Sequence, residues 1–198
     1  IMFPIGDVNG NVTAFSARVK PEKDDGPSAS SEQVKMGKYI NSPQTAVYNK
    51  SKILFGLDKA KTEIRKHDQA IIVEGQMDAI TAHQHGYKNV IASSGTALTG
   101  DQIKLIKRYS NNLLFALDSD LAGQNATDRG DKVISDINSP EVMEAEDRYG
   151  KVKTYIQPAL SEDVKTAIIQ LPFGKDPDEC IKNNPAEWEG AVKAAKPC

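Results

Sequence analysis

The sequence predicts an α/β fold in which a parallel sheet carries helices on both faces and a small β-rich region precedes the sheet. Between residues 70 and 117, three apolar runs of strand length (AIIV, NVIAS and NLLFAL) alternate with segments of helical character. Short buried strands joined by helices form right-handed βαβ units, which assemble into parallel sheets. Residues 1–19 instead resemble a hairpin, because apolar and small residues alternate on either side of a Gly- and Asn-containing turn.

The first third of the chain is predicted to lack the βαβ pattern. The hairpin strands are MFPI and VTAFSARV, and residues 21–36 are rich in Pro, Gly, Ser and charge, so we expect an exposed, mobile loop there. Residues 38–58 combine short extended pieces with polar turns.

The rest of the chain alternates strands and helices, and Gly86 and a Thr99–Gln102 capping box mark two helix ends. The expected elements are a strand at 70–73, a helix at 77–86, a strand at 89–93, a helix from Thr99 through Arg108, a strand at 112–117, a helix at 122–137, an acidic looped stretch at 138–150 and a fourth strand at 164–171.

Composition indicates a soluble globular protein. The 198 residues are 39% apolar, no apolar run is as long as a membrane span, and the N-terminus lacks a signal-peptide pattern, so a cytoplasmic location is expected. Cys180 and Cys198 are too few for a disulfide framework or a zinc ribbon. Because Ile1 stands inside a predicted strand without an initiator methionine, we expect the chain to be a piece of a longer protein.

The net charge of −2 conceals an asymmetry along the chain. Residues 1–66 hold 11 Lys and Arg against 7 Asp and Glu, whereas residues 67–198 hold 14 against 20. A basic region thus precedes an acidic one. Basic groups that bind phosphates beside acidic groups that bind metal are the combination that phosphoryl transfer requires.

Three acidic strings follow three of the predicted strands. Because parallel strands present their carboxyl ends at one edge of the sheet, these carboxylates are expected to meet there. Two unit charges about 4 Å apart repel by roughly 4 kcal/mol at an effective dielectric of 20, and a divalent cation would reverse the sign. A magnesium site is therefore the first hypothesis. The acidic residues are Glu74 and Asp78, Asp118 and Asp120, and Asp176 and Asp178.

Each acidic string also has a purely structural interpretation. Glu74 and Asp78 suit the N-terminus of a helix, Asp120 could cap the next helix, and the KDPDE string could simply begin the final helix. The ordered combination is more selective than any one string.

That combination, strand-EGxxxD, then strand-DxDxxG, then a distal DPD, resembles the TOPRIM domain of bacterial DnaG-type primases. The strings IMFPIGDVNGNVTAFSARV, KYINSPQTAVYNKSKILFGL, IASSGTALT and FGKDPDE resemble the primase RNA polymerase domain in the same order. The resemblance implies a basic subdomain at 1–66, a TOPRIM domain at 67–180 and the start of a C-terminal helical region at 181–198. The 21–36 loop and the 138–163 stretch lie outside the resemblance.

The resemblance also implies roles for particular residues. Carboxylate oxygens suit Mg²⁺ or Mn²⁺, and two or more ions are expected. The metal-binding residues would be Glu74, Asp118, Asp120, Asp176 and Asp178, with Asp78 supporting them. The residues around the incoming nucleotide's phosphates and the template would be Arg18, Lys38, Tyr39, Asn41 and Lys50.

Two positions depart from the family pattern. Leu121 stands where a basic residue commonly follows the DxD string, so no electrostatic role is expected of that side chain. The loop after Val19 is also longer than usual, so the template's path across the basic subdomain could differ.

The function that the resemblance implies is DNA-templated polymerisation of ribonucleoside triphosphates into short RNA primers. The partners would be a single-stranded DNA template, the triphosphates and the RNA–DNA hybrid product, with no membrane. A zinc-binding domain and a helicase-interacting domain would lie outside this chain, and the isolated piece could be weakly active or inactive.

Three alternatives remain open at the level of sequence. A TOPRIM topoisomerase or nuclease would share the acidic strings, although no strand-cleaving tyrosine context is evident. A haloacid-dehalogenase-type phosphatase would use Asp118 as nucleophile but leaves the EGQMD string unexplained. A module that binds nucleotides without turnover is the third alternative.

Overall fold

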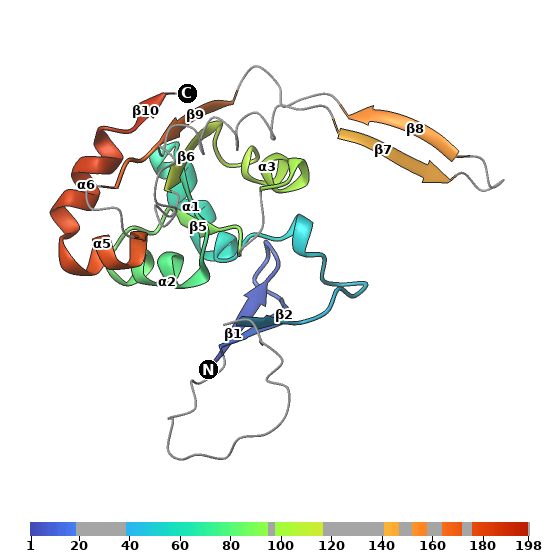
Figure 1. Ribbon diagram of the computed structural model, residues 1–198, viewed down its shortest axis with the longest axis horizontal. Coiled ribbons are helices and arrows are strands. Elements are labelled where there is room, and N and C mark those ends of the chain that lie inside the picture. The colour runs from blue at the N-terminus through green and yellow to red at the C-terminus, as the bar shows by residue number, and fades with distance from the viewer. Residues whose placement is uncertain are drawn as a thin grey trace, which may run out of the picture.

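Four parallel strands form the centre of the molecule (Figure 1). The computed structural model describes residues 1–18, 39–94, 98–116, 141–146, 152–157, 164–171 and 176–197. The strands β4 (Ala70–Val73), β5 (Val90–Ala92), β6 (Asn112–Ala116) and β9 (Lys165–Ile168) lie in the order β9-β6-β4-β5. A short antiparallel strand, β10 (Lys196–Pro197), extends the sheet beside β9. The predicted parallel sheet is therefore confirmed.

The two faces of the sheet bury different side chains because successive strand residues point to opposite sides. On one face Ile72 and Phe115 pack against α1 (Leu57–His67) and α3 (Gly100–Ile106). On the other face Ile71 and Leu114 pack with residues of α2 (Gln76–Gln84), α5 (Pro177–Asn183) and α6 (Pro185–Lys193). Burial on both faces is the reason that these strands have continuous apolar runs.

The N-terminal region forms a separate antiparallel sheet of three strands. Its strands are β1 (Met2–Gly6), β2 (Val12–Arg18) and β3 (Tyr39–Asn41), in sequence order, which confirms the predicted hairpin. Ile5, Ala14 and Tyr48 form its small core. A 3-10 helix, η1 (Lys50–Lys52), follows this sheet, with Asn49 as its N-cap.

Three specific contacts join this small sheet to the larger one. Phe55 and Ala92 exchange two backbone hydrogen bonds of 2.9 and 3.0 Å. The Lys61 Nζ donates to the Val8 carbonyl oxygen at 2.8 Å, and the buried Gln76 Nε2 donates to the Ser16 Oγ at 3.0 Å. These contacts position β2 and β3 opposite the start of α2.

Helix α1 is a structural feature that the sequence pattern did not predict. Leu57, Ala60 and Ile64 are buried against the parallel sheet, although nearly all of α1 belongs to residues 1–66, which were predicted to form the basic subdomain. Its apolar stripe is narrow, and Lys, Arg and His account for much of the remaining surface of the helix. Packing of this stripe on the parallel sheet stabilises the helix, as tertiary contacts commonly do for short helices.

The expected loop at 138–150 is wrong in its central part. Strand β7 (Glu141–Glu146) pairs in antiparallel register with β8 (Val152–Gln157), and the hairpin projects away from the rest of the fold (Figure 1). The acidic composition of 141–146 suggested a solvated loop. The segment opposite it contains Val, Thr, Tyr and Ile, which have high strand propensity. Pairing with that segment therefore outweighs the composition of 141–146. The predicted helix at 122–137 and the loop at 21–36 lie outside the described residues.

The other predicted helices are confirmed, with slightly different ends. Gly86, with a φ of 95°, follows α2, and Thr99 and Gln102 form the predicted capping box at α3. Among the described helices, none combines the length and the apolar composition that crossing a bilayer requires.

The chain order of the strands defines where a ligand can bind. From β4 the chain continues to β5 on one side and then crosses to β6 on the other side, and β4 pairs with both neighbours. In such sheets the loops at the carboxyl ends of the two strands diverge and leave a crevice between them. The crevice is therefore expected at the ends of β4 and β6, where Val73 pairs with Ala116.

Replacing Gln102 with alanine should destabilise the fold. This side chain is fully buried, and its amide donates to the carbonyl oxygens of Lys50 and Ile53 while accepting from the Thr99 backbone N–H. The loss of three hydrogen bonds and the resulting cavity should lower the free energy of unfolding by about 2–4 kcal/mol. Urea denaturation measures this change. Thr62→Ala, at an exposed position of α1, serves as the control, and an equal small effect in both variants would contradict the prediction.

Candidate nucleotidyl-transfer site

A polar cleft of about 460 Å³ lies between the small antiparallel sheet and the carboxyl edge of the parallel sheet. One wall comes from β2, β3 and η1 and carries basic and amide side chains, and the other comes from α2 and α5 and carries carboxylates. The lining residues are Arg18, Tyr39, Asn41, Lys50, Gly75, Gln76, Met77, Asp78, Ser94, Asp176, Asp178 and Lys182. The fold thus brings together charged residues from opposite ends of the chain.

The first acidic turn connects β4 to α2. Glu74 follows β4 directly and is half-buried, and Asp78 occupies the first turn of α2. The Asp78 Oδ2 accepts a hydrogen bond of 3.1 Å from the Gly75 backbone N–H. A Cβ atom on Gly75 would lie 2.5 Å from that oxygen, so the turn requires glycine for space rather than for an unusual φ.

The second acidic turn begins α5. The Asp176 Oδ1 caps the helix by accepting from the Glu179 backbone N–H at 2.8 Å, so the purely structural interpretation of the KDPDE string holds for this residue. The Asp178 carboxylate accepts hydrogen bonds from the Thr81 hydroxyl and, at 2.7 Å, from the Lys182 Nζ.

A hydrogen bond from the Asp178 backbone N–H to the Asp78 Oδ1, 3.1 Å long, joins the two acidic turns. The two carboxylate oxygens of Asp78 therefore each accept from a different turn. This places α5 against α2, although the two turns are a hundred residues apart.

Three of the sequence-predicted site residues lie outside the described residues: Lys38, Asp118 and Asp120. Asp118 follows Ala116, the last residue of β6, by two positions in the sequence.

The basic wall of the cleft contains the other four predicted residues. The Arg18 guanidinium lies 5.7 Å from the centre of the Tyr39 ring, a cation–π contact between neighbouring strands. Asn41 ends β3, and Lys50 begins η1. All four side chains line the same cleft as Asp78, Asp176 and Asp178.

The acidic wall has a negative potential that acts on Lys182. The pKa of this exposed ammonium is raised above its ordinary value, first because it donates a hydrogen bond to Asp178 and also because Asp178, Asp176 and Asp78 attract its charge, although desolvation acts in the opposite direction. The wall therefore already favours a cation.

The described carboxylates suit a divalent metal ion in their chemistry. Carboxylate oxygens are the ligands that Mg²⁺ and Mn²⁺ prefer, and Asp178, Asp176 and Asp78 already attract the charge of Lys182. Within the described ranges, however, no group of three His, Cys, Asp or Glu side chains is arranged to hold a metal ion.

Sequence reasoning missed five residues of the cleft: Gly75, Gln76, Met77, Ser94 and Lys182. Lys182 could have been found, because it stands four residues after Asp178 on a helix, the spacing at which side chains pair. Ser94 has a φ of 60°, a backbone conformation that is concentrated at functional sites, but dihedral angles cannot be read from residue types.

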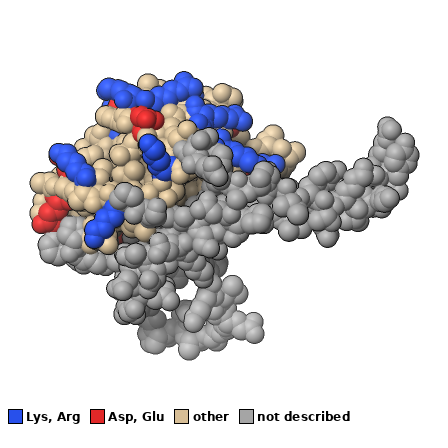
Figure 2. Space-filling view, turned by 90° about the horizontal axis from the view of Figure 1, so that it is seen from above, with Lys and Arg blue, Asp and Glu red and all other residues tan. Residues whose placement is uncertain are grey.

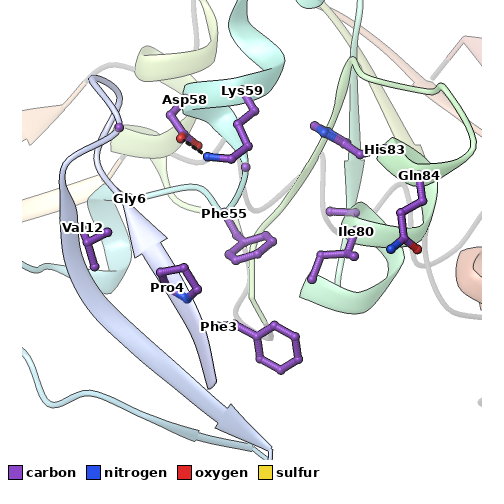
Figure 3. A pocket seen from close by; sticks show the side chains of 13 residues that line it. Phe3, Pro4, Gly6, Val12, Phe55, Asp58, Lys59, Ile80, His83 and Gln84 are labelled. Atoms are coloured by element: carbon purple, nitrogen blue, oxygen red, sulfur yellow. Dashed lines mark hydrogen bonds and ion pairs between the residues drawn. The ribbon is translucent and has the colours of Figure 1, made fainter. Parts of the chain in front are cut away.

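A second, mainly apolar pocket of about 300 Å³ lies on the other side of α2, between that helix and the β1–β2 hairpin (Figure 3). Phe3, Phe55 and Ile80 point into it, and the Asp58–Lys59 ion pair lies at one end. It lacks the separate acidic and basic walls of the polar cleft, so the polar cleft is the candidate site for phosphate chemistry.

Comparison with protein families identifies two regions of the chain. A model described as the catalytic core N-terminal domain of DNA primase matches residues 1–61, and a Toprim-like model matches residues 71–151. A DNA primase from Synechocystis is 38% identical over 186 residues, which are 93% of this chain and 24% of that relative.

Solved structures agree with these matches. The crystal structure of a DNA primase domain from Pseudomonas aeruginosa has a TM-score of 0.73 and 30% identity, and covers 99% of this chain and 51% of that one. A DnaG primase catalytic domain bound to ssDNA has a TM-score of 0.72 and 28% identity over 99% of this chain and 51% of that one.

The fold and the comparisons define the class of protein as a Toprim catalytic core with a primase-type N-terminal domain. The chain belongs to the family of bacterial DnaG-type DNA primases and corresponds to part of their catalytic core. It spans about a quarter of the length of the curated relatives it matches.

Replacing Asp178 with asparagine should lower the pKa of Lys182 toward the ordinary lysine value, because the hydrogen-bonded charge is removed. NMR titration of the Lys182 side chain measures this pKa, with Glu189→Gln on α6 as the control. Because the pKa is higher in the folded state, the pair stabilises the fold at neutral pH, and this contribution is lost as pH rises through the folded value. An unchanged pKa in the Asp178 variant would show that the ion pair does not persist in solution.

Proposed function

We propose that this chain carries the active site for DNA-templated synthesis of short RNA primers from ribonucleoside triphosphates. The observation that carries the proposal is the polar cleft, in which the carboxylates of α2 and α5 face the Arg18, Tyr39, Asn41 and Lys50 side chains. Family membership supports it, as does the ssDNA bound to a similar solved primase domain.

The acidic wall is proposed to hold divalent metal, Mg²⁺ or Mn²⁺. Two such ions would activate the primer hydroxyl and stabilise the triphosphate and leaving pyrophosphate. The proposed ligands are Glu74, Asp118, Asp120, Asp176 and Asp178. Asp78 is proposed to position the metal ligands, because the hydrogen bonds that its carboxylate accepts from the Gly75 and Asp178 backbone N–H groups hold the two acidic turns together.

The basic wall is proposed to bind phosphates. Lys50 and Arg18 would neutralise the triphosphate and the template backbone, while Tyr39 keeps the Arg18 guanidinium in place through their cation–π contact. Lys38 and Asn41 would add contacts to the same phosphates. Separation of the two walls lets the anionic substrate lie between cations on one side and metal-binding carboxylates on the other.

The wider setting of this activity follows from the family. The partners would be a single-stranded DNA template, ribonucleoside triphosphates and the RNA–DNA hybrid product, and the location the bacterial cytoplasm. A replicative helicase and a zinc ion would be bound by regions outside these residues.

Glu74→Gln and Asp118→Asn should each abolish primer synthesis, because each removes a charge from the proposed metal ligands without changing side-chain size. The assay uses a single-stranded template, ribonucleoside triphosphates and Mg²⁺ or Mn²⁺, and circular dichroism verifies the fold. Glu189→Gln, an exposed residue of α6, should retain activity. Synthesis by either well-folded site variant would refute the ligand assignment. Absence of both primer synthesis and metal-dependent nucleotide binding in the unmodified chain would refute the proposed function itself.

Lys50→Gln should weaken nucleotide binding by about tenfold or more, because a charged hydrogen bond to phosphate contributes roughly 1.5–3 kcal/mol. The remaining affinity should also depend less on salt concentration. The backbone carbonyl of Lys50, which accepts from Gln102, is unchanged by this substitution. Isothermal titration with a ribonucleoside triphosphate measures the effect, and Lys59→Gln is the control, since Lys59 is paired with Asp58 outside the cleft. Equal affinities in the two variants would count against phosphate binding by Lys50.

A further inference from the structure

The acidic wall of the polar cleft already contains a cation, the ammonium of Lys182. Its Nζ donates to the Asp178 Oδ2 at 2.7 Å, and both residues line the cleft. They lie four positions apart on α5, the spacing at which oppositely charged side chains of a helix meet. Figure 2 shows that Lys and Arg side chains gather on the face seen from above, with few Asp and Glu side chains among them. Lys182 instead interacts with the charges of Asp178, Asp176 and Asp78.

The Asp178 carboxylate accepts a hydrogen bond at each of its two oxygens. The hydroxyl of Thr81, a buried residue of α2, donates to Oδ1, and Lys182 donates to Oδ2. The Asp178 side chain is 23% exposed, whereas that of Lys182 is 50% exposed. The bond to Thr81 is therefore protected from solvent, and the bond to Lys182 is accessible.

The neighbouring carboxylates of the wall are held by backbone groups. The Asp176 Oδ1 caps α5, and the Asp78 oxygens accept from the Gly75 and Asp178 backbone N–H groups. The Lys182 ammonium, in contrast, is a point charge on a flexible side chain. A cation from solution could therefore replace it at Asp178 without breaking the bonds that hold the two acidic turns in place.

We propose that Lys182 is the resident cation of the acidic wall and that a divalent metal ion displaces it from the Asp178 Oδ2. This inference rests on the proposed function, because Asp178 is one of the ligands assigned there to the metal. It is consistent with the arrangement of the described carboxylates, which do not form a ready-made metal cluster while an ammonium covers one oxygen of Asp178.

The exchange replaces a single charge with a double one at the same carboxylate. Mg²⁺ binds oxygen at about 2.0–2.1 Å, closer than the 2.7 Å between the ammonium and Asp178, so its attraction to the carboxylate is stronger. No proton moves, because the hydrogen bond to Asp178 and the nearby carboxylates raise the pKa of Lys182, and a lysine is charged at neutral pH even without them. By competing for Asp178, Lys182 raises the metal concentration at which the site fills.

The first test measures Mn²⁺ binding to the unmodified chain and to Lys182→Gln by isothermal titration at neutral pH and constant ionic strength. Removal of the competing ammonium should tighten Mn²⁺ binding by about two- to fivefold, because a partly exposed ion pair no longer has to be broken. Lys182→Arg keeps the charge and should bind Mn²⁺ no more tightly than the unmodified chain. An unchanged affinity in Lys182→Gln would overturn the proposal.

The matched control is Lys193→Gln, which removes one exposed lysine at the end of α6. Lys193 is not among the residues that line the polar cleft. This variant should bind Mn²⁺ like the unmodified chain. Equal tightening in Lys193→Gln and Lys182→Gln would mean that the net charge of the chain controls metal affinity, and it would overturn displacement at Asp178.

The second test observes the displacement directly, by NMR of the Lys182 side chain while the unmodified chain is titrated with Mg²⁺. The ¹⁵N signal of its Nζ should move toward its position in Asp178→Asn, where the ion pair is absent, with the same midpoint as metal binding. A Lys182 signal that stays in place while Mg²⁺ binds would show that the metal uses other oxygens, and the proposal would be wrong.

Failure of the exchange is distinguishable from failure of the proposed function. If Lys182→Gln leaves Mn²⁺ binding unchanged while Glu74→Gln abolishes primer synthesis, the exchange is overturned and the proposed function stands. If the unmodified chain binds neither Mn²⁺ nor Mg²⁺, the exchange and the proposed metal ligands fail together.

Discussion

The site depends on the carboxylate of Asp78 more than on any other group. One of its oxygens accepts from the backbone of its own turn and the other from the backbone of α5, so a single side chain fixes two acidic turns that are a hundred residues apart. Gly75 leaves the room that this carboxylate occupies. A charged acceptor of backbone hydrogen bonds gives these contacts more strength than a neutral one would.

Helix α2 separates two environments of opposite character. Its first turn presents Gln76 and Asp78 to the polar cleft, whereas Ile80 and His83 line the apolar pocket behind it. The Gln76 amide also bonds Ser16 of the small sheet in a buried position. The basic and acidic walls are thus held apart by one helix that contacts both sheets, which is the arrangement that the proposed function requires.

Much of the central sheet could be predicted from sequence because its strands are buried on both faces, and short continuous apolar runs such as AIIV are typical of such strands. Helix α1 could not be predicted, since its narrow stripe of Leu57, Ala60 and Ile64 becomes a recognisable buried face only where it packs on the parallel sheet. The hairpin of β7 and β8 could not be predicted for a related reason, because the acidic segment of β7 forms a strand by pairing with β8. In the site, the acidic and most of the basic residues could be identified from sequence. Lys182 was recognised from its hydrogen bond to Asp178, and Ser94 from its backbone φ angle.

The sequence by itself determined the chemistry of this protein: carboxylates after buried strands, basic residues upstream and a primase-like order of motifs. These are properties of residue type and spacing, which local chain geometry converts directly into strand ends and helix starts. Only the tertiary structure decided that Arg18 and Lys50 line the same cleft as Asp78 and Asp178, and that the Gln102 side chain of α3 is hydrogen-bonded to the Lys50 carbonyl oxygen of η1. Those relations depend on hydrogen bonds and packing between segments far apart in the chain, and no local pattern encodes which distant segments will meet.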